Sequence, residues 1–211
     1  MSESLNWDEL LRKIDSDDQE VRHVAIEQLV EYPSLQSVPV LLRLLGDSSW
    51  RLRKRAVDLL VSLSDQSGVV TLLVGALSDE ENPGRRNAAV EALVQCGQLA
   101  VMDLLASTYS EDRDIRKFAI DILARIADGR STTRLIELLD DSDPNVQSSA
   151  ADALGMMGDQ SAARTIFRIA ADSEANHLVR FSSLRALARL EVDASPADIG
   201  DIFGDPLLRP A

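Results

Sequence analysis

The sequence has little of several residue types on which common folds and activities depend. Its single cysteine, Cys96, excludes an internal disulfide and a cysteine-based metal site, and is typical of a reducing compartment. The two histidines, His23 and His177, are too far apart to form a metal-spaced pair. Aromatic residues make up only 4% of the chain, and glycine and proline lie between the apolar segments rather than inside them. This composition favours an array of helices.

No stretch is long and apolar enough to cross a membrane as a helix. The most apolar run, from Val69 to Leu77, is far shorter than a bilayer requires. The first residues, Met1 to Leu5, lack the basic and apolar regions of a signal peptide. We therefore expect a cytoplasmic protein that does not bind membranes.

The charge balance is strongly acidic. Lysine and arginine number 22 and the acidic residues 35, so the formal net charge is −13. Such a charge repels nucleic acid unless basic residues gather on one face. Carboxylates are so common here that pairs of them do not indicate acid–base catalysis, and Cys96 lacks positive neighbours that would activate its thiol. We expect no catalytic residues, no metal and no cofactor.

An internal repeat organises the chain. Small residues recur at steps of 31, 33, 30, 31 and 33 residues: Ala25, Ala56, Ala89, Ala119, Ala150 and Ser183. Four positions after each comes a leucine: Leu29, Leu60, Leu93, Leu123, Leu154 and Leu187. Seven positions before each comes a residue that favours a helix N-cap: Asp18, Ser49, Asn82, Asp112, Asp143 and Asn176. The pattern predicts six helices in the same register, which we name B helices.

Another apolar segment, named the A helix, precedes each B helix. Six helical hairpins follow, and each must stack on its neighbours to bury its apolar face. We predict an all-α, right-handed α-solenoid (an α–α superhelix) over residues 1–193. Its approximate repeats are 5–33, 35–64, 67–97, 98–128, 129–158 and 159–193.

We expect residues 194–211 to be a C-terminal capping segment or tail. Ser195 to Asp198 could begin one more short helix that seals the end of the stack, because a terminal repeat leaves its core exposed. A peptide that docks elsewhere is the alternative.

The repeat resembles a known family. It lacks the Trp, Gly and Tyr pattern of tetratricopeptide repeats and the Thr-Pro-Leu-His signature of ankyrin repeats. A Gly-Asp break, an Asp-rich turn, then Val-Arg and Ala-Leu in helix B are typical of short HEAT-like repeats of the phycobilisome-lyase type. Matching residues are Gly158-Asp159, Asp112, Ile115-Arg116, Ala119 and Leu123. The resemblance covers roughly residues 7–192 and implies the fold, but such repeats serve many roles.

Arginine recurs three positions before the central small residue. The column contains Arg22, Arg53, Arg86, Arg116, Gln147 and Arg180. Helical geometry places it beside the core. We predict a structural ladder in which each guanidinium reaches carboxylates or carbonyls of the A–B turns, with Asp47, Glu80, Asp141 and Glu174 as available acids. Phosphate binding is the alternative.

Two further columns face away from the core of the B helices. One contains Glu27, Asp58, Glu91, Asp121, Asp152 and Arg185, and the other His23, Lys54, Asn87, Lys117, Ser148 and Phe181. In HEAT-like solenoids the B helices line the concave surface, so we expect these residues to form its floor, with Ser148 and Asp152 in the least basic repeat. The alternative is a solvated face of i,i+4 pairs such as Lys54–Asp58.

We assign a binding site to this floor, with Trp50 as an additional anchor. The predicted binding residues are Glu27, Lys54, Asp58, Glu91, Lys117, Asp121, Asp152, Phe181 and Arg185. The favoured function is a non-enzymatic scaffold that binds a helix or a basic, extended segment of a protein partner. The repeat resemblance offers a bilin lyase subunit as the alternative, and DNA binding as a third reading that the acidic column argues against. We expect neither a nucleic acid nor a small molecule as the ligand.

Overall fold

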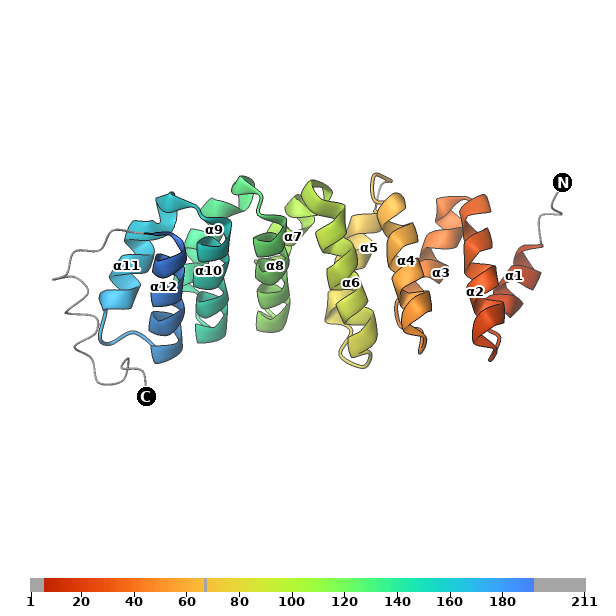
Figure 1. Ribbon diagram of the computed structural model, residues 1–211, viewed down its shortest axis with the longest axis horizontal. Helices are drawn as coiled ribbons and strands as arrows, with labels where there is room; N and C mark the ends of the chain where they lie inside the picture. The colour runs from red at the N-terminus through yellow and green to blue at the C-terminus, as the bar shows by residue number, and fades with distance from the viewer. Residues whose placement is uncertain (1–5, 67, 192–211) are drawn as a thin grey trace. The chain divides into compact units, whose positions relative to one another are not determined.

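The computed structural model describes residues 6–66 and 68–191. All regular structure in these residues is helical (Figure 1). The α-helices are α1 (Trp7–Ile14), α2 (Gln19–Gln28), α3 (Ser34–Leu44), α4 (Trp50–Ser62), α5 (Val69–Gly75), α6 (Pro83–Cys96), α7 (Val101–Ser107), α8 (Arg113–Ile126), α9 (Thr132–Glu137), α10 (Pro144–Met157), α11 (Ala163–Ala171) and α12 (His177–Arg189). The predicted capping segment, 194–211, lies outside the described residues.

Short 3-10 segments continue or introduce several of these helices. They are η1 (Leu29–Glu31), η2 (Ala76–Ser78), η3 (Gly97–Leu99), η4 (Gly129–Ser131), η5 (Leu138–Asp140) and η6 (Gln160–Ala162). The odd-numbered α-helices are the predicted A helices and the even-numbered ones are the predicted B helices. The all-α solenoid class is therefore confirmed.

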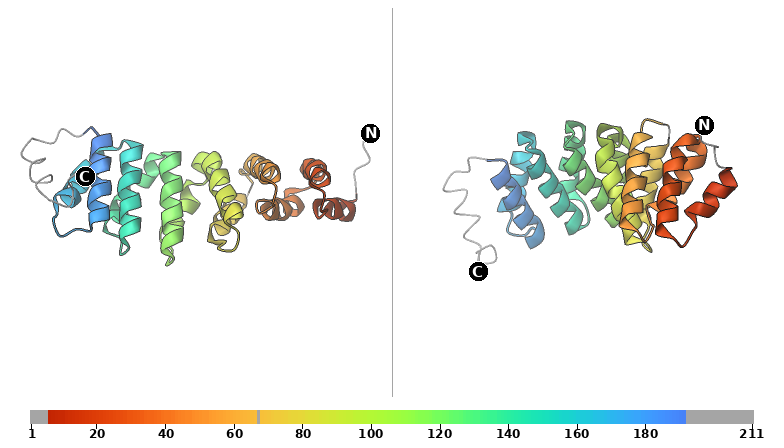
Figure 2. Two further views of the ribbon diagram at one scale, coloured as in Figure 1. Left: turned by 60° about the horizontal axis from the view of Figure 1, so that its bottom comes forward. Right: turned by 45° about the vertical axis from the view of Figure 1, so that its right-hand side comes forward.

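The chain divides into two compact units, Met1–Ala100 and Val101–Ala211. The first contains three hairpins, built from α1 to α6, and the second contains three more, built from α7 to α12. Within the first unit α4 packs between α2 and α6, and within the second α10 packs between α8 and α12 (Figures 1 and 2). Each unit thus has a layer of B helices backed by a layer of A helices.

The six predicted caps are confirmed. Each is the N-cap of its B helix, and five of the six side chains accept a backbone N–H from the first turn. Ser49 is the exception: its buried hydroxyl makes no cap bond, while its N–H donates to Oδ1 of Asp47 at 2.8 Å. Asp143 accepts from Asn145 and Val146, and the first of these bonds is the main reason that the pKa of Asp143 is lowered.

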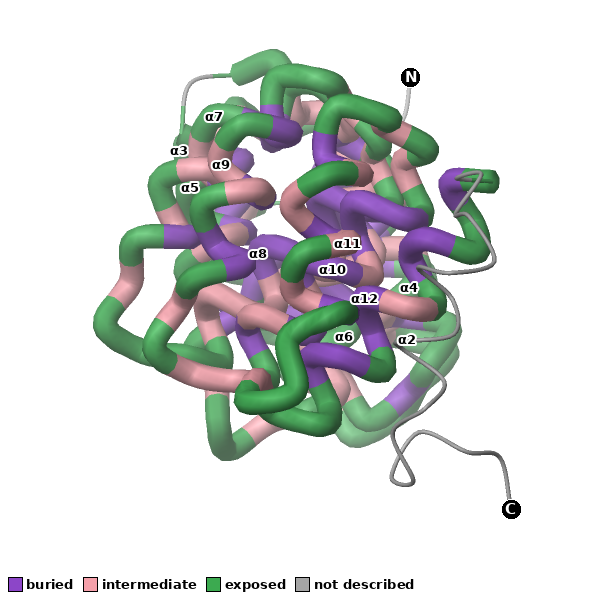
Figure 3. Tube along the Cα trace, turned by 90° about the vertical axis from the view of Figure 1, so that its left-hand side faces the viewer, coloured by how far each residue is buried: buried purple, intermediate pink, exposed green. Residues whose placement is uncertain are grey.

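The repeat columns form the cores of the two units. All six central small residues are fully buried, and so are five of the six leucines, with Leu187 almost fully buried. Figure 3 shows that each helix passes between buried and exposed positions, as expected for helices packed on one face. In the second unit one buried cluster includes Leu139 of η5, Leu154 of α10 and Ile166 of α11, which lie in three successive helical segments.

Two sequence expectations were wrong. Pro39 lies inside α3, where the buried neighbours Val38 and Val40 hold the helix despite the lost N–H. Ser148, which we had placed on the exposed floor, is only 8% exposed, and its hydroxyl lies 2.5 Å from that of Ser182. The reason is the close approach of α10 and α12.

Small residues permit that approach. A Cβ added to Gly155 would lie 2.6 Å from Cα of Ala186, so no side chain fits there. Ser148 and Ser182 meet at the other end of the same contact and satisfy each other's hydroxyl groups. The position of a column around its own helix therefore does not predict solvent exposure where a neighbouring helix comes this close.

Replacing Leu154 by alanine tests the core register. The side chain is fully buried, so Leu154→Ala should destabilise the second unit by about 2–5 kcal/mol in urea unfolding. The control is Leu178→Ala on α12, where the side chain is 45% exposed and a much smaller loss is expected. Equal losses for the two variants would contradict the register.

Candidate functional site

The predicted binding residues fall into two groups, one on each unit. The first unit contains Glu27 on α2, Lys54 and Asp58 on α4, and Glu91 on α6, with Trp50 at the start of α4. The second contains Lys117 and Asp121 on α8, Asp152 on α10, and Phe181 and Arg185 on α12. All lie on the B-helix side that faces away from the core.

Ion pairs link the B helices of the first unit. Arg55 donates from Nε and Nη2 to the two carboxylate oxygens of Glu27, at 2.7 and 2.5 Å. Lys54 bonds Glu91 at 2.7 Å and Asp58 at 3.2 Å. The bond from Arg55 lowers the pKa of Glu27, and the bond to Glu91 raises the pKa of Lys54. Each carboxylate of the predicted column in this unit therefore has a cation.

The second unit has the same arrangement. Lys117 pairs with Asp121 at 2.9 Å within α8. Arg185 donates from Nε to Oδ1 of Asp152 at 2.8 Å and also pairs through Nη2, so α12 and α10 are joined. The guanidinium of Arg185 also lies over the ring of Phe181, 5.6 Å from its centroid.

The predicted acidic column is thus a lattice of ion pairs rather than a bare stripe of negative charge. These pairs are solvent-exposed, so each contributes only about 0–1 kcal/mol to stability. A basic partner would have to compete with four cations already in place: Lys54, Arg55, Lys117 and Arg185. The role of this face in binding stays a prediction.

The arginine column makes a repeated set of bonds. Arg22 donates from Nη1 to the carbonyls of Ser16 and Asp17, in the turn before its own helix. Its Nε and Nη2 then form a bidentate pair with Asp47, with both bonds at 3.0 Å. We call the two donors of this arginine, Nε and Nη2, the arginine fork. It ties the second A–B turn to the first B helix, with both side chains largely buried.

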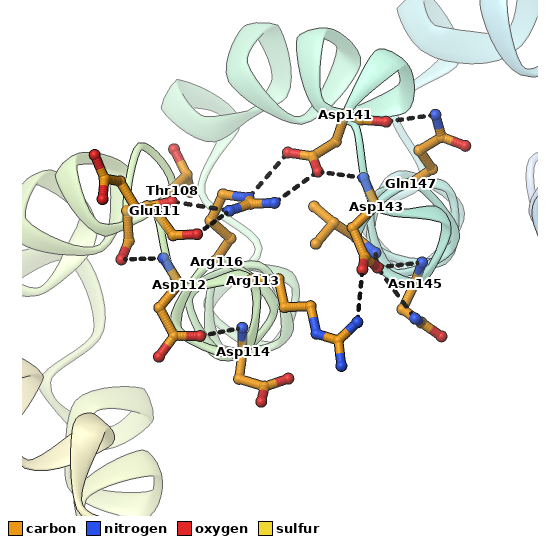
Figure 4. A network of polar contacts seen from close by, with 12 residues as sticks. Thr108, Glu111, Asp112, Arg113, Asp114, Arg116, Asp141, Asp143, Asn145 and Gln147 are labelled. Atoms are coloured by element: carbon orange, nitrogen blue, oxygen red, sulfur yellow. Dashed lines mark hydrogen bonds and ion pairs between the residues drawn. The ribbon is translucent and has the colours of Figure 1, made fainter.

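Arg116 repeats this geometry in the second unit (Figure 4). Nη1 bonds the carbonyls of Ser110 and Glu111, while the fork holds Asp141 at 3.0 and 2.8 Å. Oδ1 of Asp141 also accepts the N–H of Asp143, the cap of the next B helix. One carboxylate therefore joins two successive repeats.

Three other rungs, Arg53, Gln147 and Arg180, make different bonds. Arg53 makes the two carbonyl bonds, to Asp47 and Ser48, but no fork contact with a carboxylate. Gln147 keeps a single carbonyl bond, to Asp141 at 2.6 Å. Arg180 is 1% exposed and donates to the carbonyl of Ala170, and Arg86 is half-buried on α6.

The forks of Arg22 and Arg116 occur at repeat steps of the same length. Both complete forks lie in repeats followed by a step of 31 residues, from Ala25 to Ala56 and from Ala119 to Ala150. The steps that follow Arg53 and Gln147 are 33 residues, by the same subtraction. The A–B turn after Arg53 presents Asp79, whose Oδ1 accepts the N–H of Asn82 and whose Oδ2 pairs with Arg85 instead.

A cavity lies at each of these two longer steps. In the first unit, a cavity of about 270 Å³ between α4 and α6 is lined by Trp50, Arg53, Lys54, Gly84 and Glu91 among others. In the second, one of about 410 Å³ is lined by Gln147, Arg168, Asp172, Asn176 and Val179 among others. The first cavity brings together Trp50, Lys54 and Glu91 of the predicted binding site and Arg53 of the predicted ladder.

Two features of the site were missed in the sequence. Arg55 lies one position before the central alanine, and its partner Glu27 is 28 residues earlier, so only the offset between stacked helices reveals the pair. The cavities also carry no residue signature. The one available signal was the pair of 33-residue steps.

Other kinds of site find little support in the described residues. Residues 6–66 and 68–191 contain no group of three or more His, Cys, Asp or Glu that could hold a metal ion. Cys96 is buried, and burial raises the pKa of its thiol. No helix in the same residues is long and apolar enough to cross a membrane.

The family model for HEAT repeats matches residues 8–94 and 101–188. These two stretches account for most of the chain, and they coincide with the three hairpins of each unit. The protein therefore belongs to the HEAT-repeat family, and the resemblance inferred from the repeat pattern is confirmed.

One relative with a known role is the phycocyanobilin lyase subunit beta of Nostoc sp. strain PCC 7120. It is 36% identical to this chain over 112 residues, which cover 53% of this chain and 54% of the relative. The chain thus spans about half the length of that relative.

Two solved structures are similar to this chain at low identity. The TOG3 domain of Drosophila melanogaster Mini spindles has a TM-score of 0.55 at 14% identity, covering 88% of this chain and 94% of its own. The complex of CpcE and CpcF of phycocyanin lyase from Nostoc sp. has a TM-score of 0.33 at 17% identity, covering 94% of this chain and 92% of its own. Of these two, the TOG3 likeness supports a helical solenoid and shows the fold alone.

The arginine fork leads to a prediction with an internal control. Arg116→Gln keeps a donor for the carbonyl, as Gln147 does, but leaves Asp141 without its cation. We expect a loss of about 1.5–3 kcal/mol in urea unfolding, the typical value of charge-assisted hydrogen bonds.

The same substitution at Arg53 is the control. Because its fork holds no carboxylate, Arg53→Gln should cost less than about 1 kcal/mol. Equal losses at the two positions would show that the fork contributes nothing and that the carbonyl bonds carry the stability.

Proposed function

We propose that this protein is a HEAT-repeat subunit that acts with a second protein to attach a bilin chromophore to a phycobiliprotein or to remove it. One observation carries the proposal: the 36% identity over 112 residues with a phycocyanobilin lyase subunit. Such identity is well above the 14% at which the TOG3 domain shares the fold alone. The comparison thus favours the alternative reading of the sequence over a general scaffold.

The role of a partner protein follows from the relative's description as a subunit. HEAT repeats present extended surfaces built from successive hairpins, and these suit protein partners. In each unit the B-helix face carries a large exposed apolar side chain, Trp50 at 68% exposure in the first and Phe181 at 56% in the second. Exposed aromatic residues of this kind commonly anchor a protein interface.

A scaffold that binds a protein but no chromophore is the second candidate. The same exposed Trp50 and Phe181 favour it, since neither side chain requires a pigment as its ligand. The two candidates predict the same protein-binding surface and differ in whether a bilin binds.

Bilin binding is tested by absorption spectroscopy. Phycocyanobilin is mixed with the purified chain, alone and with a protein partner recovered by affinity pulldown from the native cell. We expect a shifted visible absorption maximum, because a bound tetrapyrrole is held in fewer conformations than a free one. An unchanged spectrum in both samples would remove the bilin proposal and leave the scaffold.

The protein-binding surface is tested by alanine variants in the pulldown. Trp50→Ala and Phe181→Ala should each weaken partner capture by about ten-fold or more, as expected for anchor residues. Both side chains are exposed, so the fold should not change.

The matched control for these variants is Val24→Ala on α2, an apolar side chain 61% exposed on a B helix. Capture of the partner at the wild-type level by both aromatic variants would place the interface elsewhere.

A further inference from the structure

The cavity between α4 and α6 of the first unit has chemistry that the proposed function does not use. It combines an exposed aromatic side chain, Trp50, with the guanidinium group of Arg53. Its remaining wall includes the small and apolar residues Val57, Gly84 and Ala88. A cationic donor beside an apolar wall is suited to an anion attached to an apolar group.

Arg53 has donors to spare. Its Nη1 bonds the carbonyls of Asp47 at 2.7 Å and Ser48 at 3.0 Å. Within the described residues, its Nε and Nη2 have no hydrogen-bond partner. In Arg22 and Arg116 these same two atoms hold a carboxylate, that of Asp47 and Asp141 respectively. The fork of Arg53 is therefore the same donor pair without its acceptor.

The neighbouring carboxylates are already engaged. Asp79 caps the turn before α6 and pairs with Arg85. Glu91, on the cavity wall, accepts from Lys54 at 2.7 Å and from Gln95 at 3.2 Å. In the described residues, therefore, no carboxylate binds Arg53 in the way that Asp47 binds Arg22 and Asp141 binds Arg116.

The backbone leaves room for a ligand at this place. A Cβ built on Gly84 would lie 3.7 Å from Cδ and Nε of Arg53, so a longer side chain there would crowd the fork. The cavity volume of about 270 Å³ lies just below the range of about 300–1,000 Å³ that encloses drug-sized ligands. It therefore suits one arm of a ligand rather than a whole tetrapyrrole.

We propose that this cavity is a binding site for a carboxylate carried on a short apolar arm. Nε and Nη2 of Arg53 hold the carboxylate as the forks of Arg22 and Arg116 hold aspartate, and Trp50 covers the arm. Bilin propionates and glutamate side chains of a protein partner share this chemistry. The site itself needs only a carboxylate, so it does not depend on the proposed function.

The probe is 3-phenylpropionate, a carboxylate two methylene groups from a flat ring, with its neutral amide as the matched compound. The full ¹⁵N-labelled chain is titrated and its tryptophan indole N–H signals are followed by NMR. There are two tryptophans in the chain. We expect the Trp50 signal to move with the carboxylate and much less with the amide. Trp7, whose ring lies 4.9 Å from that of Tyr32, should not move and serves as the internal reference.

Arg53→Gln is the decisive variant. It keeps a donor for the carbonyl, as the chain itself does at Gln147, so folding should be retained. Its affinity for the carboxylate should fall by about ten- to a hundred-fold, since two charge-assisted hydrogen bonds are lost. The control is Arg51→Gln, which removes a positive charge at a position two residues earlier. The side chain of Arg51 does not line the cavity, so the affinity of this variant should equal that of the wild type.

Two further arms identify the source of the carboxylate. One titrates a bilin diacid and its dimethyl ester, and the other titrates N-acetyl-glutamate amide and its glutamine counterpart. Loss of bilin binding on esterification and in Arg53→Gln supports a propionate, and the corresponding result with glutamate supports an acidic partner residue. A Trp50 signal unmoved by every carboxylate, or moved equally by the neutral compounds, overturns the proposal. A bilin that binds independently of Arg53, together with a Trp50 signal unmoved by the other carboxylates, would leave the proposed function intact and overturn this site alone.

Discussion

The bond between a B-helix arginine and the following A–B turn is the interaction on which the repeat geometry depends. Arg22 and Arg116 each bind two carbonyls of their own turn and one aspartate of the next. That aspartate also accepts a backbone N–H at or near the next helix cap. Both side chains are largely buried, so loss of either partner would leave a buried charge without its counter-ion. The buried leucines form the core, and the fork joins neighbouring hairpins at their turns.

Much of the fold could be predicted because the repeat offers six independent copies of one pattern. A cap, a small residue and a leucine at set distances locate each B helix, and all six caps and leucines have the expected places. Pro39 and Ser148 departed from expectation for a common reason. Their environment is set by what packs against the helix, and neither periodicity nor residue type contains that information. Gly155 and Ala186 show how two small residues alter the exposure of a whole face.

Less of the candidate site could be predicted. The exposed columns were located from helical geometry, but the charge they present was not, because Arg55 and Arg185 reach acids on the neighbouring helix. Five carboxylates in a column suggested an acidic groove, and five ion pairs make it nearly neutral. Pairing between repeats depends on the offset between stacked helices, which a single sequence does not encode in any one residue.

The two 33-residue steps have a consequence for how such proteins diversify. The 33-residue steps leave the buried columns in place, and each has a cavity beside a rung without a carboxylate, Arg53 in one and Gln147 in the other. A repeat array can therefore carry a recess at a longer repeat, with a column arginine in its wall where that rung is arginine, as at Arg53. Binding specificity in this architecture can evolve through repeat length, without a single substitution in the core.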